Sequence, residues 1–345
     1  MEPNSILSRL VDFQNLNSAE SYELFLKIME GKISPILVGA ILTALRMKGE
    51  TKEEIVGAAK AMREKSLKVP LKENLRKIAI DTCGTGGDRK GTFNISTAVA
   101  FVVASANVPV AKHGNRAVSS KIGSADILEA LGIKIDLNPQ EVAKCIEETN
   151  FGFIFAPKFH LAMKNVVPIR KELKIRTIFN MLGPLTNPAQ VERQILGVYS
   201  KLAAELIAES LIDLGTKRAC VVHGEDGLDE ISVCAPTYII EVQEENLECY
   251  FINPSDFGIP NYSLKDLKAK DSLEENKKIF EKLLSGKLSR CAILDAVVLN
   301  AAFAFKVAGK ADTAKEGLEL AYDLINEGKP FEILEKVRNF SKSLG

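Results

Sequence analysis

The chain has 345 residues, of which 46% are hydrophobic and 26% charged, and its 45 basic side chains balance 45 acidic ones. A neutral chain lacks the long-range positive field of a dedicated nucleic-acid-binding protein, so any recognition of anions must be local. The length exceeds that of a usual single core and predicts two domains or lobes.

Cysteine usage and hydropathy predict a cytoplasmic protein with neither a nucleic-acid nor a membrane partner. The six cysteines are scattered singly, which favours reduced thiols over disulfides or a zinc site. The N-terminus lacks a basic region followed by an apolar stretch, which argues against a signal peptide. The longest apolar segments, 98–111 and 291–308, are interrupted by polar and charged residues and predict no membrane span.

The N-terminal residues 1–72 predict a small all-helical domain. The spacings Asn17-x-x-Glu20 and Thr51-x-x-Glu54 are typical of capped helix starts, and Ser34 precedes a proline at a first helical position. Apolar residues between 33 and 45 form a face wide enough to pack on neighbouring helices and on a partner subunit. A core within one chain is the alternative explanation of that face.

From residue 78 onward, short buried strands alternate with helices, which predicts a larger α/β domain over residues 73–345. Its central sheet is expected to be mixed, largely parallel and flanked by helices, with ligand sites at the carboxyl ends of the strands. Helices from about 165–190 are expected to pack on the helical domain. The predicted strands are 78–80, 108–111, 151–155, 194–199, 218–223 and 238–242, and the predicted helices include 94–105, 124–131, 273–284, 290–308, 312–327 and 331–342.

A glycine-rich loop after the first strand predicts a phosphate site. In DTCGTGGDRKGTFNISTA, residues 81–98, three glycines let backbone amides approach an anion closely. The run Asn94–Thr97 then begins a helix, whose free amides can point toward the same anion. Neither the P-loop pattern nor G-x-G-x-x-G is present, so P-loop nucleotides and Rossmann dinucleotides are not favoured.

Two further polar clusters follow later strands. In KHGNRAVSS, residues 112–120, lysine and arginine supply charge, and asparagine and serines supply directed hydrogen bonds. Taken singly, each of these residues has an ordinary structural explanation, but together they indicate a site for several phosphates. Asp229 and Glu230, after a strand and a glycine turn, offer oxygen ligands suited to the magnesium that accompanies a phosphate substrate; a solvated acidic loop is the alternative.

The motifs GTGGD, NISTA, KHGNRAVSS, GSADILEALG, RTIFNMLGPLTNP and GLDEIS resemble, in this order, those of the anthranilate phosphoribosyltransferases. The similarity covers nearly the whole chain. It implies transfer of the phosphoribosyl group from 5-phosphoribosyl 1-diphosphate (PRPP) to the amine of anthranilate, with release of pyrophosphate, in tryptophan biosynthesis. It also implies Mg²⁺ as cofactor and a homodimer joined through the helical domains.

The resemblance also implies roles for individual residues. Ser96, Asp229 and Glu230 are the implied metal ligands, and Gly84, Asn115 and Arg170 the implied contacts of anthranilate. His113 is a candidate proton acceptor, and His113, His160 and the Gly183-Pro184 turn are expected to line the entrance for anthranilate. The implied PRPP contacts are Gly84, Gly87, Asp88, Thr92, Asn94, Ile95, Ser96, Thr97, Lys112, His113, Gly114, Asn115, Arg116, Ala117, Val118, Ser119, Ser120 and Ser124.

Two other functions stay open at this stage. A pyrimidine nucleoside phosphorylase shares the expected architecture, but its loop resembles K-H-S-T-G-G-x-G-D, where this chain has D-T-C-G-T-G-G-D. A non-enzymatic nucleic-acid-binding relative is disfavoured by the zero net charge and by the intact Asp229-Glu230 pair.

Overall fold

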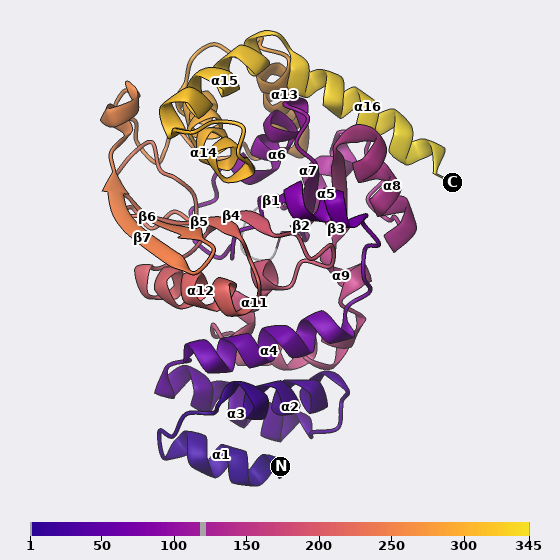
Figure 1. Cartoon of the computed structure of the whole chain (residues 1–345), viewed down its shortest axis with the longest axis vertical. Coiled ribbons are helices and arrows are strands. Elements are labelled where there is room, and N and C mark those ends of the chain that lie inside the picture. Colours follow the sequence, from indigo (N-terminus) through magenta and orange to yellow (C-terminus); the bar gives the residue numbers. More distant parts are fainter. Residues whose placement is uncertain (1, 118–121, 345) are drawn as a thin grey trace.

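The computed structural model describes residues 2–117 and 122–344, and four helices form a bundle at the end that holds the N-terminus (Figure 1). They are α1 (Pro3–Val11), α2 (Ser18–Met29), α3 (Pro35–Lys48) and α4 (Lys52–Lys65). The predicted helix starts are confirmed. Asn17 and Thr51 each form a capping box with the glutamate three residues later, and the hydroxyl of Ser34 caps α3.

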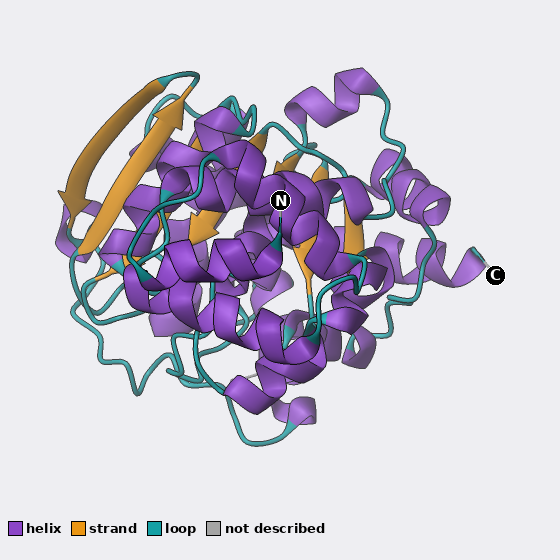
Figure 2. Ribbon diagram, turned by 90° about the horizontal axis from the view of Figure 1, so that it is seen from below, coloured by secondary structure: helices purple, strands orange, loops and turns teal. Residues whose placement is uncertain are grey.

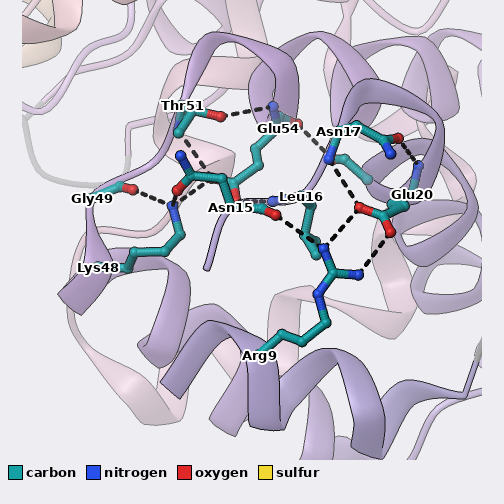
Figure 3. A network of polar contacts seen from close by, with 10 residues as sticks. Arg9, Asn15, Leu16, Asn17, Glu20, Lys48, Gly49, Thr51 and Glu54 are labelled. Carbon is teal, nitrogen blue, oxygen red and sulfur yellow. Dashed lines mark hydrogen bonds and ion pairs between the residues drawn. The ribbon is translucent and has the colours of Figure 1, made fainter. Parts of the chain in front are cut away.

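A polar network fixes how these helices meet (Figure 3). Glu54, which is fully buried, accepts hydrogen bonds from the backbone N–H groups of Leu16 and Thr51, each at 3.0 Å, and from Nζ of Lys48 at 3.0 Å. Arg9 of α1 pairs with Glu20 of α2 at 2.7 Å. The network therefore joins α1, the α1–α2 loop, and the ends of α3 and α4.

The larger part contains a seven-stranded sheet, in the order β3-β2-β1-β4-β5-β6-β7. Strands β1 to β5 are parallel and the last two antiparallel, so the expected mixed, largely parallel sheet is confirmed. The first strand begins two residues later than predicted because 73–78 forms helix α5, and β7 was not predicted. The strands are β1 (Ile80–Asp81), β2 (Val110–Gly114), β3 (Phe151–Phe155), β4 (Arg193–Gly197), β5 (Arg218–Gly224), β6 (Thr237–Gln243) and β7 (Asn246–Ile252).

Helices cover the sheet, as Figures 1 and 2 show. In Figure 1, α6 and α13 to α16 lie above the sheet, and α11 and α12 lie between it and the bundle. No helix within 2–117 and 122–344 has the length and apolar character needed to cross a bilayer. The helices of this part are α5 (Glu73–Ile78), α6 (Ile95–Ser105), α7 (Ser124–Ala130), α8 (Pro139–Thr149), α9 (Ala156–Phe159), α10 (Val167–Leu173), α11 (Phe179–Leu185), α12 (Lys201–Asp213), α13 (Leu273–Leu284), α14 (Ala292–Ala308), α15 (Ala314–Asn326) and α16 (Lys329–Ser343).

Two hydrophobic cores lie on opposite faces of the sheet. Along β5, Cys220 and Val222 pack into the core that contains α6 and α14, whereas Ala219 and Val221 pack into the core that contains α12 and the bundle. This is the period-two alternation of a strand buried on both faces. The second core thus continues from the sheet into the bundle, although the predicted division at residues 72 and 73 stays a prediction.

Side-chain hydrogen bonds reinforce that continuity. Arg63 of α4 donates to the carbonyl oxygens of Leu185, at 2.7 Å, and Leu214, at 2.9 Å. Asn165 donates to the carbonyl oxygen of Met29 at 2.7 Å. Segments from the middle of the chain are therefore bound directly to the first helices.

Candidate active site

The three predicted polar clusters meet at one edge of the sheet because they follow parallel strands. The glycine loop follows β1, residues 115–117 follow β2, and Asp229-Glu230 follow β5. The chain turns to one side of β1 to form β2 and β3 and returns on its other side with β4 and β5. Such a reversal of strand order places the loops on either side of a crevice, which is the usual ligand site of an open α/β sheet.

Glycines bring the loop, β4 and the acidic segment into backbone contact. The N–H of Thr85 donates to the carbonyl oxygen of Gly197 at 2.8 Å. A Cβ atom at Gly197 would lie 1.5 Å from the carbonyl oxygen of Asp229, and one at Gly84 would lie 2.9 Å from that of Gly197. Side chains at these two positions would force the three segments apart, so the absence of a Cβ is required here.

Lys112 connects β2 to the glycine loop from inside the protein. Its side chain is 1% exposed, and Nζ donates to the hydroxyls of Thr82, at 3.2 Å, and Ser96, at 3.3 Å. Burial lowers the pKa of this lysine, while the neighbouring acidic groups, among them Asp81 and Glu230, oppose that shift. A buried ammonium that faces Ser96 is placed to attract an anion at the start of α6.

The acidic residues repel one another. Burial raises the pKa of Asp229 to about 7, the neighbouring Asp88 adds to the rise, and a backbone hydrogen bond from Gly86 offsets part of it. Burial and then the charge of Asp229 raise the pKa of Glu230 well above its ordinary value. Oδ2 of Asp88 is buried and has no hydrogen-bond partner among the described residues. The cluster therefore has an unused acceptor, and its carboxyl groups are costly to ionise together unless a cation binds.

His113 and His160 form a buried pair with determined tautomers. Nδ1 of His113 lies 3.2 Å from the carbonyl oxygen of Gly183, which can only accept, so Nδ1 carries the proton. Nε2 of His113 must then accept from Nε2 of His160, also at 3.2 Å. Burial lowers the pKa of His113 to about 4 and that of His160 well below its ordinary value. Both rings are therefore neutral, and both nitrogens of His113 are occupied.

Asp81 orders the backbone beneath this pair. It is fully buried and accepts the N–H of His113 at 3.1 Å and the side-chain amide of Asn187 at 2.7 Å. Burial raises the pKa of Asp81 to about 6, and Lys112 opposes that rise. The same Asn187 amide donates to the carbonyl oxygen of Ala111, so the end of β2 is held from two sides.

The residues predicted to bind anthranilate lie on separate segments. Arg170, on α10, is half-buried; its guanidinium lies 5.7 Å from the ring centre of Phe179, and burial lowers its pKa. Within the described residues, Arg170 has no carboxylate partner. Asn115, exposed after β2, accepts the N–H of Arg116 at 2.7 Å. Arg170 is thus a cation whose charge is balanced by no carboxylate of the described chain.

The other predicted contacts of PRPP lie around the same edge. Asn94 donates to the carbonyl oxygen of Ile122 at 3.1 Å, and the buried hydroxyl of Thr97 has no partner among the described residues. Arg116 is exposed and pairs with Asp126, at 3.0 Å, and Glu129. Val118, Ser119 and Ser120 lie outside the described residues. The remaining positions are Thr92, which bridges to Lys268; Ile95, in the first turn of α6; Gly114, the last residue of β2; Ala117, whose N–H donates to Asp126; and Ser124, the first residue of α7.

Comparison with known proteins connects this site to one family. Residues 76–331 match the α/β domain of a glycosyl transferase family, and residues 4–66 match its helical bundle domain. The chain is 50% identical to an anthranilate phosphoribosyltransferase of Persephonella marina over 97% of this chain and 98% of that protein. A relative from Thermoanaerobacter is 49% identical, over 98% of both chains. The chain belongs to the anthranilate phosphoribosyltransferase family.

Solved structures of this family agree with the fold. The enzyme of Thermus thermophilus superposes with a TM-score of 0.91 at 40% identity, over 98% of this chain and 99% of that one. The enzyme of Saccharomyces cerevisiae in complex with PRPP and Mg superposes with a TM-score of 0.90 at 31% identity, over 99% of this chain and 98% of that one.

The acidic cluster of the site fits Mg²⁺. Asp229 and Glu230 bring carboxylates together against their own repulsion, and the buried Oδ2 of Asp88 is left without a partner among the described residues. Magnesium prefers such oxygen donors and would remove the repulsion. Asp229 and Glu230 are the residues that would hold it, with Ser96 at the adjacent helix start.

Sequence reasoning missed three residues that shape this site. Gly197 ends β4 in L-G-V, where a glycine after an apolar strand signals a close backbone approach. Asn187 lies within the motif RTIFNMLGPLTNP, but no local pattern reveals that its amide reaches Asp81. Arg176, in R-T-I-F-N, donates to the carbonyl oxygen of Gly87 at 2.5 Å, which only the folded chain reveals.

Proposed function

We infer that this chain transfers the phosphoribosyl group of PRPP to the amine of anthranilate, giving N-(5-phosphoribosyl)anthranilate and pyrophosphate, in tryptophan biosynthesis. The observation that supports this most is the meeting of the glycine loop, Lys112 and the Asp229-Glu230 pair at the reversal point of a parallel sheet. Close backbone amides, a buried cation and repelling carboxylates together suit a magnesium-bound diphosphate.

The site residues divide into a group for the leaving pyrophosphate and a group for the acceptor. As the bond from ribose C1 to pyrophosphate oxygen breaks, negative charge develops on the leaving group, and Lys112 and the amides of the glycine loop stabilise it. Magnesium, when bound by Asp229 and Glu230, neutralises further charge on the diphosphate. The unpartnered hydroxyl of Thr97 lies near the start of α6 and is available to a phosphate oxygen.

For the acceptor, anthranilate, the site residues position the substrate and do not remove a proton from its amine before the attack. Arg170 pairs with the carboxylate of anthranilate, and Gly84 and Asn115 complete its pocket. The neutral amine attacks C1 with its lone pair as the bond from C1 to the pyrophosphate oxygen breaks, and the proton of the resulting anilinium then passes to water or to the departing pyrophosphate. His113 is a poor candidate for a base because Gly183 and His160 occupy both of its nitrogens. We assign it a structural role at the end of β2.

One assay tests the reaction and its rivals. Protein, PRPP, Mg²⁺ and anthranilate are mixed, and the fluorescence of anthranilate is followed; we expect it to decay with stoichiometric release of pyrophosphate. No decay, together with phosphorolysis of thymidine or uridine, would establish the phosphorylase instead. A salt-dependent DNA mobility shift without either activity would support the non-enzymatic alternative.

We also propose a homodimer that forms through the helical bundle. An apolar groove of about 720 Å³ lies among α1, α3 and α10, and Ile36, Met47 and Phe13 on it are 88%, 74% and 67% exposed. Exposed apolar patches of this kind are typical of protein interfaces. Sedimentation should give the mass of a dimer for the wild type and of a monomer for Ile36→Glu. A monomeric wild type at micromolar concentration would refute the proposal.

A cytoplasmic location is the last part of the proposal. All six cysteines are free in the structure, as expected for a reducing compartment. Cys145 and Cys220 are buried, so alkylation is done in denaturant at the moment of cell lysis; it should label all six thiols, and protection of any pair would contradict the assignment.

A further inference from the structure

The tip of the glycine loop has an unusual backbone. Gly86 and Gly87 have φ values of +65° and +81°, and Arg89, which is not a glycine, has +59°. The base of the loop is fixed, because Thr85 donates to the carbonyl oxygen of Gly197. Peptide groups that flank a glycine can rotate with little steric cost, so the tip requires contacts from elsewhere to keep one orientation.

Arg176 provides such a contact. Its Nη2 donates to the carbonyl oxygen of Gly87 at 2.5 Å, and its guanidinium lies 4.1 Å from the ring centre of Tyr199. Tyr199 stands two residues after Gly197, so the same strand end holds the base of the loop directly and its tip through Arg176. The guanidinium is planar, and stacking on an aromatic ring restricts the directions in which its N–H groups point.

This hydrogen bond fixes a whole peptide plane. The carbonyl of Gly87 and the N–H of Asp88 belong to one trans peptide and point in opposite directions. With the carbonyl directed to Arg176, the N–H of Asp88 must point away from Arg176. If the plane flipped, the carbonyl dipole would replace the N–H, and an anion on that side would be repelled instead of bound.

We propose that Arg176 is a positioning residue for the PRPP site: stacked on Tyr199, it holds the Gly87–Asp88 peptide in the orientation that presents an N–H to the diphosphate. The proposal rests on the proposed function, which makes the loop the PRPP site. Arg176 also stands six residues after Arg170, the residue assigned to anthranilate, so one short segment serves both substrates.

The test separates PRPP binding from anthranilate binding and from folding. For Arg176→Ala we expect the KM for PRPP, and its Kd measured by calorimetry with Mg²⁺ and no anthranilate, to rise about 10- to 100-fold, in keeping with the loss of a hydrogen bond from a charged donor. The KM for anthranilate and the melting temperature should stay unchanged. Arg176→Lys keeps a donor but loses the planar group that stacks on Tyr199, so its affinity for PRPP should lie between that of Arg176→Ala and that of the wild type.

Matched variants complete the design. Tyr199→Phe keeps the ring and should bind PRPP as the wild type does, whereas Tyr199→Ala should weaken PRPP binding. Arg76→Ala, which removes an arginine of α5 that pairs with Glu192 and lies before β1, at the end of the strand opposite to the loop, is the control for loss of positive charge. Unchanged PRPP affinity in Arg176→Ala, or equal losses for both substrates, would overturn the proposal. Calorimetry keeps the test independent of the reaction: a wild type that binds PRPP but leaves anthranilate unconsumed refutes the proposed function alone.

Discussion

The helical bundle and the candidate active site both bury charged side chains, but they balance the charges differently. In the bundle, both carboxylate oxygens of Glu54 have partners within the chain, among them Lys48 (Figure 3). In the site, Asp229, Glu230 and Asp88 repel one another, and Oδ2 of Asp88 has no partner among the described residues. Because a buried unpaired charge is costly, its presence indicates that a ligand completes the balance. Buried charges that have partners within the chain thus stabilise the fold, whereas buried charges that lack them indicate a binding site.

The largest effect should come from neutralising the site's acidic pair. For Asp229→Asn combined with Glu230→Gln, we expect kcat/KM for PRPP to fall about 10³-fold, because the charge that holds magnesium on the leaving group is lost. The melting temperature in the absence of magnesium should not fall, since the substitutions remove repulsion. Steady-state kinetics and calorimetric melting measure the two quantities. A melting temperature lower by more than about 5 °C would mean that the pair contributes to the stability of the fold.

The converse experiment removes a buried carboxylate of the bundle, that of Glu54, whose oxygens both have partners within the chain. Glu54→Ala leaves the buried ammonium of Lys48 without its carboxylate, and we expect the free energy of unfolding to fall by about 3 kcal/mol. Urea denaturation measures it, and kcat/KM per folded molecule should be unchanged. Glu53→Ala, on the exposed side of the same helical turn, is the control and should cost less than about 0.5 kcal/mol. Equal costs for the two variants would show that the network of Figure 3 contributes little.

The histidine pair gives a smaller, pH-dependent effect. The pKa of His113 is about 4 in the folded protein and near 6.5 in an unfolded chain, so the unfolded state binds more protons between these values. The contribution of the pair to stability must therefore fall as the pH drops through this window, by about 2 kcal/mol for His113 alone between pH 7 and pH 5. Asp81 and Asp229, whose pKa values are raised, act in the opposite direction in both proteins, so the comparison of wild type and variant isolates the pair. Urea denaturation at both pH values should show a smaller loss for the double variant His113→Gln, His160→Gln than for the wild type. An equal loss would mean that the pair is not buried in neutral form.

The two regions also differ in how much of them the sequence predicts. The bundle follows from local rules, because Asn17 and Thr51 cap helices as their spacing indicates. The parallel sheet follows from another local signal, the alternation of strands and helices along the chain. Phosphate-binding loops are local as well, because a glycine turn and a helix start are adjacent in the chain. The Asp229-Glu230 pair indicated magnesium by its residue types and its place after a strand. Motif resemblance added Ser96 as a metal ligand and Arg170 as a contact of anthranilate, which residue spacing alone does not assign.

What escaped prediction depends on contacts between distant segments. Strand β7 lies at the edge of the sheet and is exposed along most of its length, so it does not show the buried apolar pattern of the strands that were predicted. Asn187 acts on Asp81 across more than 100 residues, and the occupancy of both nitrogens of His113 depends on Gly183 and His160. Partners that only the fold brings together leave no periodic signal in the sequence.

The comparison also holds for the positive charges of two half-buried arginines, Arg63 in the bundle and Arg170 near the site. Arg63 uses its guanidinium on the carbonyl oxygens of Leu185 and Leu214, whereas Arg170 has no carboxylate partner among the described residues. For Arg170→Ala we expect the KM for anthranilate to rise about tenfold or more, because a charge-assisted pair with the substrate carboxylate is lost, with the KM for PRPP nearly unchanged. Arg63→Ala should instead lower the melting temperature and leave both KM values as they are. Equal losses for both substrates in Arg170→Ala would contradict its assigned role, since a contact with the acceptor alone cannot weaken the binding of the donor.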